Sequence, residues 1–98
     1  MSKVKELLAE SRTVENEDAL IKLCRSNYPA VALEVARSKH ATPRVLDSLT
    51  RHPSITVRHA VAMNSNTSKE TLSRLGEDKD QLVRDYAKRT LQETSTSK

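Results

Sequence analysis

The chain of 98 residues holds three histidines that could ligate a metal ion. His52 and His59 are seven positions apart, with a proline and an expected helix start between them, and His40 falls in an expected turn between helices. No second cysteine or carboxylate completes a set of ligands at the spacing that zinc sites use. The sequence therefore predicts histidines of surfaces and turns, with neither a metal site nor a cofactor.

Cys24 is the only cysteine, which excludes a disulfide within the chain. We expect it to be a small buried residue at a helix end, without a reactive partner. A single cysteine fits the reducing interior of a cell. No apolar run has the length of a signal peptide or approaches the roughly 20 residues that span a bilayer. We therefore expect a soluble, cytoplasmic protein with no membrane contact.

Motifs of catalytic sites are missing from the sequence. It contains no glycine-rich phosphate loop, no nucleophile elbow of the GxSxG type and no His/Glu pair on one helix face. Tyr28 and Tyr86 are the only aromatic residues, so the extrusion of a nucleic-acid base or the stacking of single-stranded bases has little to build on. The sequence predicts that the protein is not an enzyme.

Positive charge is concentrated in the middle of the chain. Residues 19–75 contain nine Lys or Arg and three Asp or Glu, whereas residues 1–18 are acidic and residues 76–98 are balanced. Such an excess is either a solvated surface or a patch that binds an acidic protein or phosphates. The candidates for a binding surface are Arg37, Lys39, Arg44, Arg51, Arg58, His59, Arg74 and Arg84.

The elements that must position these side chains recur with a period of 26 residues. Two apolar columns of the self-alignment lie four residues apart, namely Val31, Val57 and Val83, then Val35, Val61 and Ala87. The i, i+4 spacing places both columns on one face of a helix. A second stripe, with i, i+3 spacing, consists of Leu46 and Leu49 above Leu72 and Leu75. Each unit is therefore expected to be a pair of helices, the second one shorter.

Residues that begin and end helices recur together with the apolar columns. Side chains that accept a hydrogen bond from a helix N-terminus precede the second helix at Asn16, Thr42 and Ser68, and the first helix at Ser54 and Asp80. Pro29 and Pro43 fall at first helical positions, where a missing N–H costs nothing. Gly76 directly follows Leu75 and is placed to end a helix.

These patterns predict an all-α solenoid of about three and a half helix pairs. The approximate units are 1–23, 24–49, 50–75 and 76–91, which together form a single domain over residues 1–91. The polar residues 92–98 are expected to form a disordered tail.

The succession "SITVRHAVAMNSNTSKETLSRL" (54–75), followed by "DKDQLVRDYAK" (78–88), resembles the leucine-rich repeat variant family. The resemblance implies units of an α-helix and a short 3₁₀-type helix, stacked into a right-handed superhelix related to HEAT and armadillo arrays. Two features depart from the family. Ala32 stands where Arg58 and Arg84 occur in the later units, and Cys24 alone cannot ligate the iron–sulfur centre that some members carry.

Arg58 and Arg84 occupy equivalent positions in consecutive units, and stacked helices lie about 8–10 Å apart. Asp80 precedes Arg84 by four residues and could also face Arg58 across the unit boundary. We favour a structural ladder in which Asp80 separates the two charges. The alternative is a ridge that binds a phosphate or carboxylate, because guanidinium groups suit bidentate contacts.

Helical-repeat surfaces without catalytic residues usually bind other molecules. The sequence favours a small intracellular interaction module that docks an acidic protein through its basic surface. The alternative function is binding to the phosphate backbone of DNA or RNA. Because a short array leaves its ends partly uncapped, self-association into a homo-oligomer through one end is a further expectation.

Overall fold

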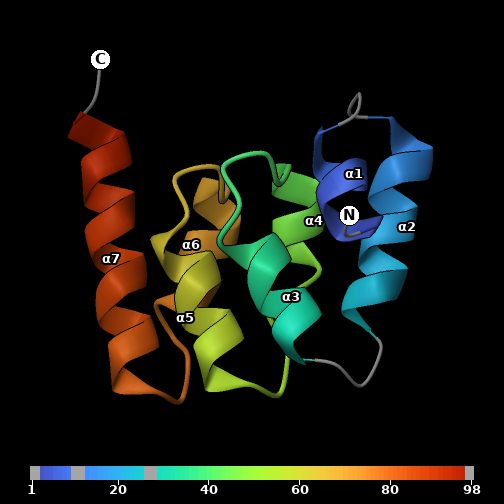
Figure 1. Cartoon of the computed structure of the whole chain (residues 1–98). Coiled ribbons are helices and arrows are strands. Elements are labelled where there is room, and N and C mark those ends of the chain that lie inside the picture. The colour runs from blue at the N-terminus through green and yellow to red at the C-terminus, as the bar shows by residue number, and fades with distance from the viewer. Residues whose placement is uncertain (1–2, 10–12, 26–28, 97–98) are drawn as a thin grey trace.

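This computed structural model describes residues 3–9, 13–25 and 29–96. The regular secondary structure in these ranges is entirely helical, and turns connect the helices. In order, they are α1 Lys3–Ala9, α2 Val14–Cys24, α3 Pro29–Ala36, α4 Pro43–Asp47, α5 Ile55–Met63, α6 Lys69–Leu75 and α7 Gln81–Thr96 (Figure 1). The all-helical class predicted from the sequence is thus confirmed over these ranges. Tyr28, one of the two aromatic residues, lies outside them.

The helices form a slab of about 35 × 32 × 19 Å. Helices α3, α5 and α7 lie side by side in one row, and the shorter helices α4 and α6 lie behind them (Figure 1). Helix α5 packs against both α3 and α7, while α1 packs against α2 and α3 at the N-terminal side. None of the helices in the described ranges has the length and apolar character needed to cross a lipid bilayer.

Polar side chains begin most of these helices at the expected positions. Four of them accept a hydrogen bond from the backbone N–H three residues ahead, namely Thr42 for α4, Ser54 for α5, Ser68 for α6 and Asp80 for α7. The prediction is wrong for Asn16, because α2 begins before it and Thr13 is the capping residue. Thr13 has the extended backbone that a cap requires, and its Oγ1 accepts a hydrogen bond from the Asn16 N–H at 3.1 Å.

The short helices α4 and α6 are α-helical rather than 3₁₀-helical, which corrects what the family resemblance implies. The Leu46 N–H donates to the Thr42 carbonyl at 3.0 Å, and the Leu72 N–H donates to the Ser68 carbonyl at 2.9 Å. These i to i−4 bonds are the α-helical pattern. Gly76 ends α6 with right-handed helical dihedrals, and a Cβ at this position would come within 3.3 Å of a carbonyl oxygen of the same helix.

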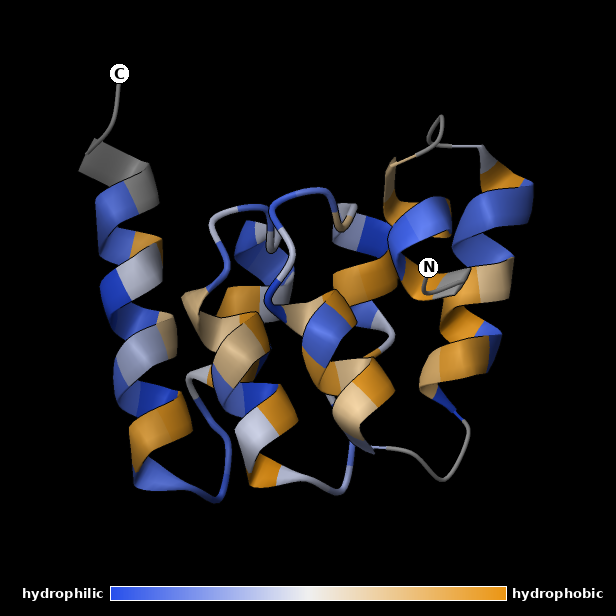
Figure 2. Ribbon diagram, in the orientation of Figure 1, coloured by the Kyte–Doolittle hydropathy of each residue, from blue (hydrophilic) through white to orange (hydrophobic). Residues whose placement is uncertain are grey.

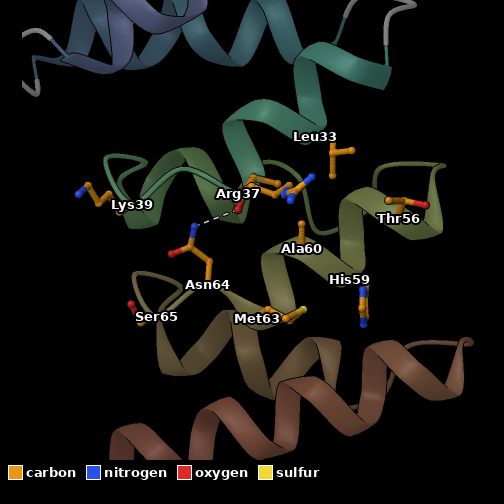
Figure 3. Close-up of a pocket in the computed structure, with 10 residues that line it drawn as sticks. Leu33, Arg37, Lys39, Thr56, His59, Ala60, Met63, Asn64 and Ser65 are labelled. Atoms are coloured by element: carbon orange, nitrogen blue, oxygen red, sulfur yellow. Dashed lines mark hydrogen bonds between the residues drawn. The ribbon is translucent and has the colours of Figure 1, made fainter.

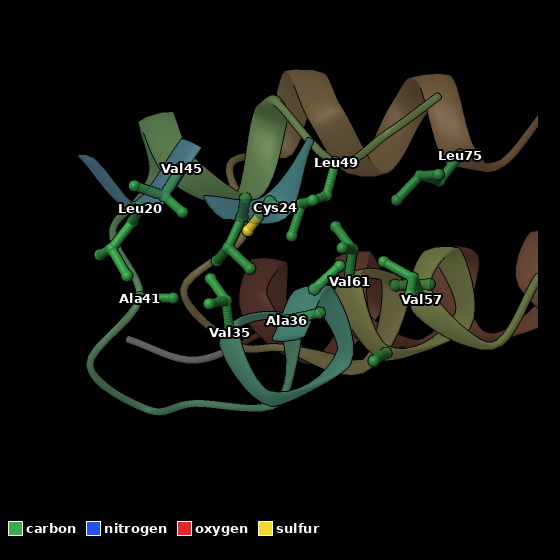
Figure 4. Close-up of a cluster of buried hydrophobic side chains, with 14 of the residues drawn as sticks. Leu20, Cys24, Val35, Ala36, Ala41, Val45, Leu49, Val57, Val61 and Leu75 are labelled. Carbon is green, nitrogen blue, oxygen red and sulfur yellow. The ribbon is translucent and has the colours of Figure 1, made fainter. Parts of the chain in front are cut away.

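One apolar core lies between the row α3, α5, α7 and the helices behind it (Figure 2). The buried members of the predicted stripes are Val35, Leu46, Leu49, Val57, Val61, Leu72, Leu75, Val83 and Ala87, whereas Val31 is only partly buried. Figure 4 shows side chains of α3 and α5 facing Leu49 and Leu75 across this core. Cys24, the last residue of α2, is buried there as expected. Burial of each leucine contributes about 1.5–3 kcal/mol to stability.

Helix α7 continues to Thr96, so residues 92–96 are helical where the sequence suggests a disordered tail. Two features explain the extension. The chain contains neither proline nor glycine after Gly76, so no residue interrupts the helix. The hydroxyl of Thr90 also donates to the Ala62 carbonyl at 2.6 Å, which fixes α7 against α5. Residues 97–98 of the expected tail lie outside the described ranges.

Candidate functional site

A groove of about 510 Å³ between α3 and α5 is the main candidate for a binding site (Figure 3). Its lining consists of Leu33, Ala36, Arg37, Lys39, Thr56, His59, Ala60, Met63, Asn64 and Ser65. Leu33, Ala60 and Met63 give the groove an apolar surface, and Met63 is 52% exposed. No acidic residue contributes to this lining within the described chain, so the groove combines apolar surface with positive charge.

The wall that carries Lys39 is held in place by asparagines from the following unit. Asn64 Nδ2 donates to the carbonyls of Ala36 and Ser38, each at 2.9 Å, and the bond to Ala36 is dashed in Figure 3. Asn66 Nδ2 donates to the Lys39 carbonyl at 2.7 Å. These bonds satisfy carbonyls at and beyond the end of α3 that no helical N–H reaches. The groove is therefore built on an ordered turn.

Arg37 and Lys39 are exposed at this groove, and neither side chain takes part in an ion pair or side-chain hydrogen bond with the described residues. Their charges are thus available to an acidic partner. His59 contributes to the same lining, and its ring meets that of Tyr86 edge to face with 4.5 Å between the centroids. Its Nε2 atom is buried without a hydrogen-bond partner among the described residues. The structure thus brings three of the eight candidate residues together.

Arg44 and Arg74 lie at the short helices α4 and α6 and are neutralised by acids. Arg44 pairs with Glu17 at 3.2 Å and with Asp18 at 2.8 Å, and the hydrogen bonds with these two carboxylates raise its pKa above the ordinary value. Arg74 pairs with Asp47 at 3.0 Å. Arg44 therefore binds two acids on α2, Arg74 binds one on α4, and neither arginine lines the α3/α5 groove.

Arg58 is buried, and all of its guanidinium nitrogens are engaged. Its Nε donates to Asp78 at 2.9 Å and its Nη2 donates to the same carboxylate at 3.3 Å. Its Nη1 donates to the carbonyls of His52 at 2.7 Å and Pro53 at 3.2 Å. This geometry supports the structural interpretation of Arg58, because the side chain is buried and each of its three nitrogens already donates within the fold.

Arg84 repeats part of this arrangement one unit later, since its Nη1 donates to the carbonyls of Asp78 and Lys79 at 2.6 and 3.0 Å. The carboxylate that pairs with Arg58 is that of Asp78, which corrects the expectation of Asp80, whereas Arg84 contacts the backbone carbonyl of Asp78. The carboxylate of Asp80 is occupied at the N-terminus of α7, where it accepts from the Val83 N–H at 3.1 Å. The sequence did not single out Asp78, because its partner lies 20 residues away in the chain.

Electrostatics around Arg58 shift the pKa values of two neighbours. Burial alone would raise the pKa of Asp78. The carboxylate accepts hydrogen bonds from the Asp80 N–H and from Arg58 and lies beside the charge of Arg58. These effects outweigh burial and lower the pKa below its ordinary value. Burial and the charge of Arg58 lower the pKa of His52. Both residues are therefore held in the charge state that accommodates the guanidinium, Asp78 ionised and His52 neutral.

The remaining candidate, Arg51, is exposed in the turn before α5, where it lines a separate cavity of about 720 Å³. The α3/α5 groove is lined by α5 residues from Thr56 to Met63 and shares no lining residue with that cavity. Acidic and basic residues share the lining around Arg51, including Lys79 and Glu77. The eight candidates therefore do not form one continuous basic face.

Other expectations concern metals, thiol chemistry and self-association. Within the described ranges, no three His, Cys, Asp or Glu side chains gather in a way that could hold a metal ion. Burial raises the pKa of Cys24 to about 11, so its thiol is not activated.

The exposed side chains of α7 up to residue 93 are polar or charged apart from Leu82. That end of the slab therefore offers little apolar surface to a second copy.

Sequence reasoning missed Asn64 and Met63, which line the groove, and Asn66, which bonds with the turn that carries Lys39. The two asparagines stand in the polar turn "NSN" between helices, a composition that signals side-chain bonds with backbone groups. Met63 gives a weaker signal, because it follows the apolar stripe of α5 and only the structure shows its exposure. In comparisons with known proteins, no family model, no curated protein and no solved structure matches this chain.

Proposed function

We propose that the chain is a short right-handed α-solenoid of about three and a half helix pairs, as in the leucine-rich repeat variant family that it resembles. Helices α3, α5 and α7 begin at Pro29, Ile55 and Gln81, 26 residues apart, which supports this proposal. Bonds between units recur at the same offset. Asn64 donates to the Ala36 carbonyl, and Thr90 donates to the Ala62 carbonyl.

On this framework, we infer that the protein is a non-catalytic interaction module that binds another protein of acidic character. The observation that carries this proposal is the α3/α5 groove, where Arg37 and Lys39 have no side-chain partner among the described residues and lie beside the apolar surface of Leu33 and Met63. Interfaces between proteins combine apolar anchors with complementary charge in this way. Desolvation of Met63 would supply affinity, and the two cations would select an acidic surface.

Binding to a nucleic-acid backbone is the weaker alternative. Phosphate binding of that kind depends on several free cations that neutralise phosphates along a track. Arg44, Arg58 and Arg74 are already engaged with carboxylates. Of the other exposed candidates in the described chain, Arg37 and Lys39 line the groove whereas Arg51 lines a separate cavity, so these cations do not form a continuous track.

The test is quantitative capture of binding proteins by the immobilised chain, with and without nuclease, for three versions of the protein. The double variant Arg37→Glu, Lys39→Glu reverses the charge of the groove. The matched control Arg51→Glu, Lys79→Glu reverses two exposed charges outside it. We expect capture that resists nuclease, survives in the control and is lost in the groove variant. Capture that requires nucleic acid, or that persists undiminished in the groove variant, contradicts the proposal.

A further inference from the structure

A second groove, of about 570 Å³, lies on the other side of α3, between α3 and α1. Its lining consists of Lys5, Leu8, Ala9, Ala30, Leu33, Glu34, Arg37, Ser38 and His40. Leu33 and Arg37 border both grooves and stand one helical turn apart. They therefore form a ridge between two largely apolar depressions, and Arg37 marks the point at which the two meet.

The distance between the two grooves selects the conformation of a ligand that fills both. Packed helices lie about 8–10 Å apart, so depressions on either side of one helix are separated by about the same distance. In an extended chain, side chains on one face recur at about 6.7 Å or 13 Å, and both spacings lie farther from this range than the helical one does. In an α-helix, residues i and i+7 lie on one face about 10.5 Å apart. A helix that crosses α3 can thus place one anchor in each groove.

The charges of the two grooves define the residue between those anchors. Position i+3 or i+4 of such a helix falls above the ridge, beside the Arg37 guanidinium, which no side chain in the described part of the chain engages. Lys39 borders one groove and Lys5 borders the other, while Glu34 is the single acid in the described lining of either. An acidic residue between the anchors therefore complements the ridge, and a basic residue there would be repelled.

We propose that the two grooves together bind one amphipathic helix of a partner protein, with two large apolar residues seven positions apart and an acidic residue between them. The inference rests on the proposed protein-binding function and specifies its partner. The apolar residues occupy the α1/α3 and α3/α5 grooves, and the acid pairs with Arg37. Helix α1 is then part of the binding site rather than only a cover for the core.

The test uses synthetic alanine-rich helical peptides titrated into the ¹⁵N-labelled full chain. The reference peptide carries two leucines seven positions apart, with glutamates at the third and fourth positions after the first leucine. We expect backbone shift changes at residues of α1, α3 and α5, including Ala9 and Met63. Moving the second leucine to the fifth position after the first, which does not lie on the same helix face and leaves both glutamates in place, should weaken binding about tenfold or more.

Reversal of charge on both sides tests the contact with Arg37 independently of the apolar anchors. Arg37→Glu should weaken the reference peptide about tenfold, and replacing the peptide glutamates by lysines should restore binding to that variant. Arg51→Glu is the matched control and should leave the affinity unchanged.

The outcomes separate this inference from the proposed function. Equal affinity for both leucine spacings, with shift changes confined to α3 and α5, overturns the two-groove inference and leaves the α3/α5 groove as a binding site. Binding of the lysine peptide to the unaltered chain as tightly as the glutamate peptide overturns the role of Arg37. If no acidic peptide binds and the groove variant still captures its partner, both proposals fail.

Discussion

Replacement of Arg58 by alanine should lower the free energy of unfolding by about 3 kcal/mol. The variant loses two bonds with the Asp78 carboxylate and two with the carbonyls of His52 and Pro53. The side chain of Asp78 is 9% exposed and would keep the Asp80 N–H as its remaining donor among the described residues. Removal of one partner from a buried ion pair costs about 3–5 kcal/mol, and the position of this pair at a turn favours the lower end.

The assay is urea unfolding followed by circular dichroism, with thermal unfolding as a second measurement. In a domain of this size, 3 kcal/mol corresponds to a fall in Tm of roughly 12–24 °C. Arg84→Ala is the comparison and should cost about 1 kcal/mol, because within the described residues the Arg84 side chain donates to carbonyls and not to a carboxylate. The double variant Arg58→Ala, Asp78→Ala should cost clearly less than the sum of its single variants.

Two results would refute this reasoning about Arg58. One is a loss of less than about 1 kcal/mol in Arg58→Ala, which would mean that water replaces the guanidinium without cost. The other is strict additivity of the two alanine variants, which would show that Arg58 and Asp78 stabilise the fold independently. Either result would reopen the interpretation of Arg58 as a residue that binds an external anion.

Three further predictions follow from the same contacts. Because the folded-state pKa of Asp78 is lowered, the stability that its charge contributes is complete above its unfolded pKa near 3.9 and is lost as the pH falls through the folded pKa. The stability difference between the native chain and Asp78→Asn, measured by urea unfolding, should therefore shrink on acidification. A difference that grows would contradict this. Asn64→Ala should cost about 1–3 kcal/mol and speed amide exchange around Ser38, whereas unchanged exchange would show that the turn is held by other contacts. Cys24 should resist alkylation at pH 8 in the folded chain and react in urea, since its thiol is buried and its pKa is about 11; rapid labelling of the folded protein would be the opposite outcome.

Much of the fold was accessible from the sequence because the apolar columns and the capping residues agree with each other. Thr42 and Ser68 cap the short helices, and the valine and leucine columns fill the core as expected. The error at Asn16 has a simple cause. Two residues with capping side chains stand three positions apart, and only the backbone decides which one is extended, here Thr13.

The site was less accessible, because charge on a sequence does not reveal which charges are already paired. Arg44 and Arg74 count toward a basic surface until the neighbouring helices bring Glu17, Asp18 and Asp47 against them. Those pairings depend on how consecutive helices stack, which periodicity alone does not give. Asp80 was assigned to the arginines for the same reason, since the competing demand of the α7 N-terminus becomes visible only in three dimensions.

The bonds of Asn64 and Thr90 have a consequence for how such a chain can change length. Each donates to a carbonyl 28 residues earlier, and the two acceptors, Ala36 and Ala62, are themselves one 26-residue block apart. Excision of residues 50–75 would thus bring Thr90 opposite Ala36, with a donor and an acceptor already matched at the new junction. Duplication of the same block would likewise reproduce the existing junction rather than create a new one. Gain or loss of a whole block should accordingly preserve these bonds, while an insertion of another length between donor and acceptor would shift the donor away from its carbonyl.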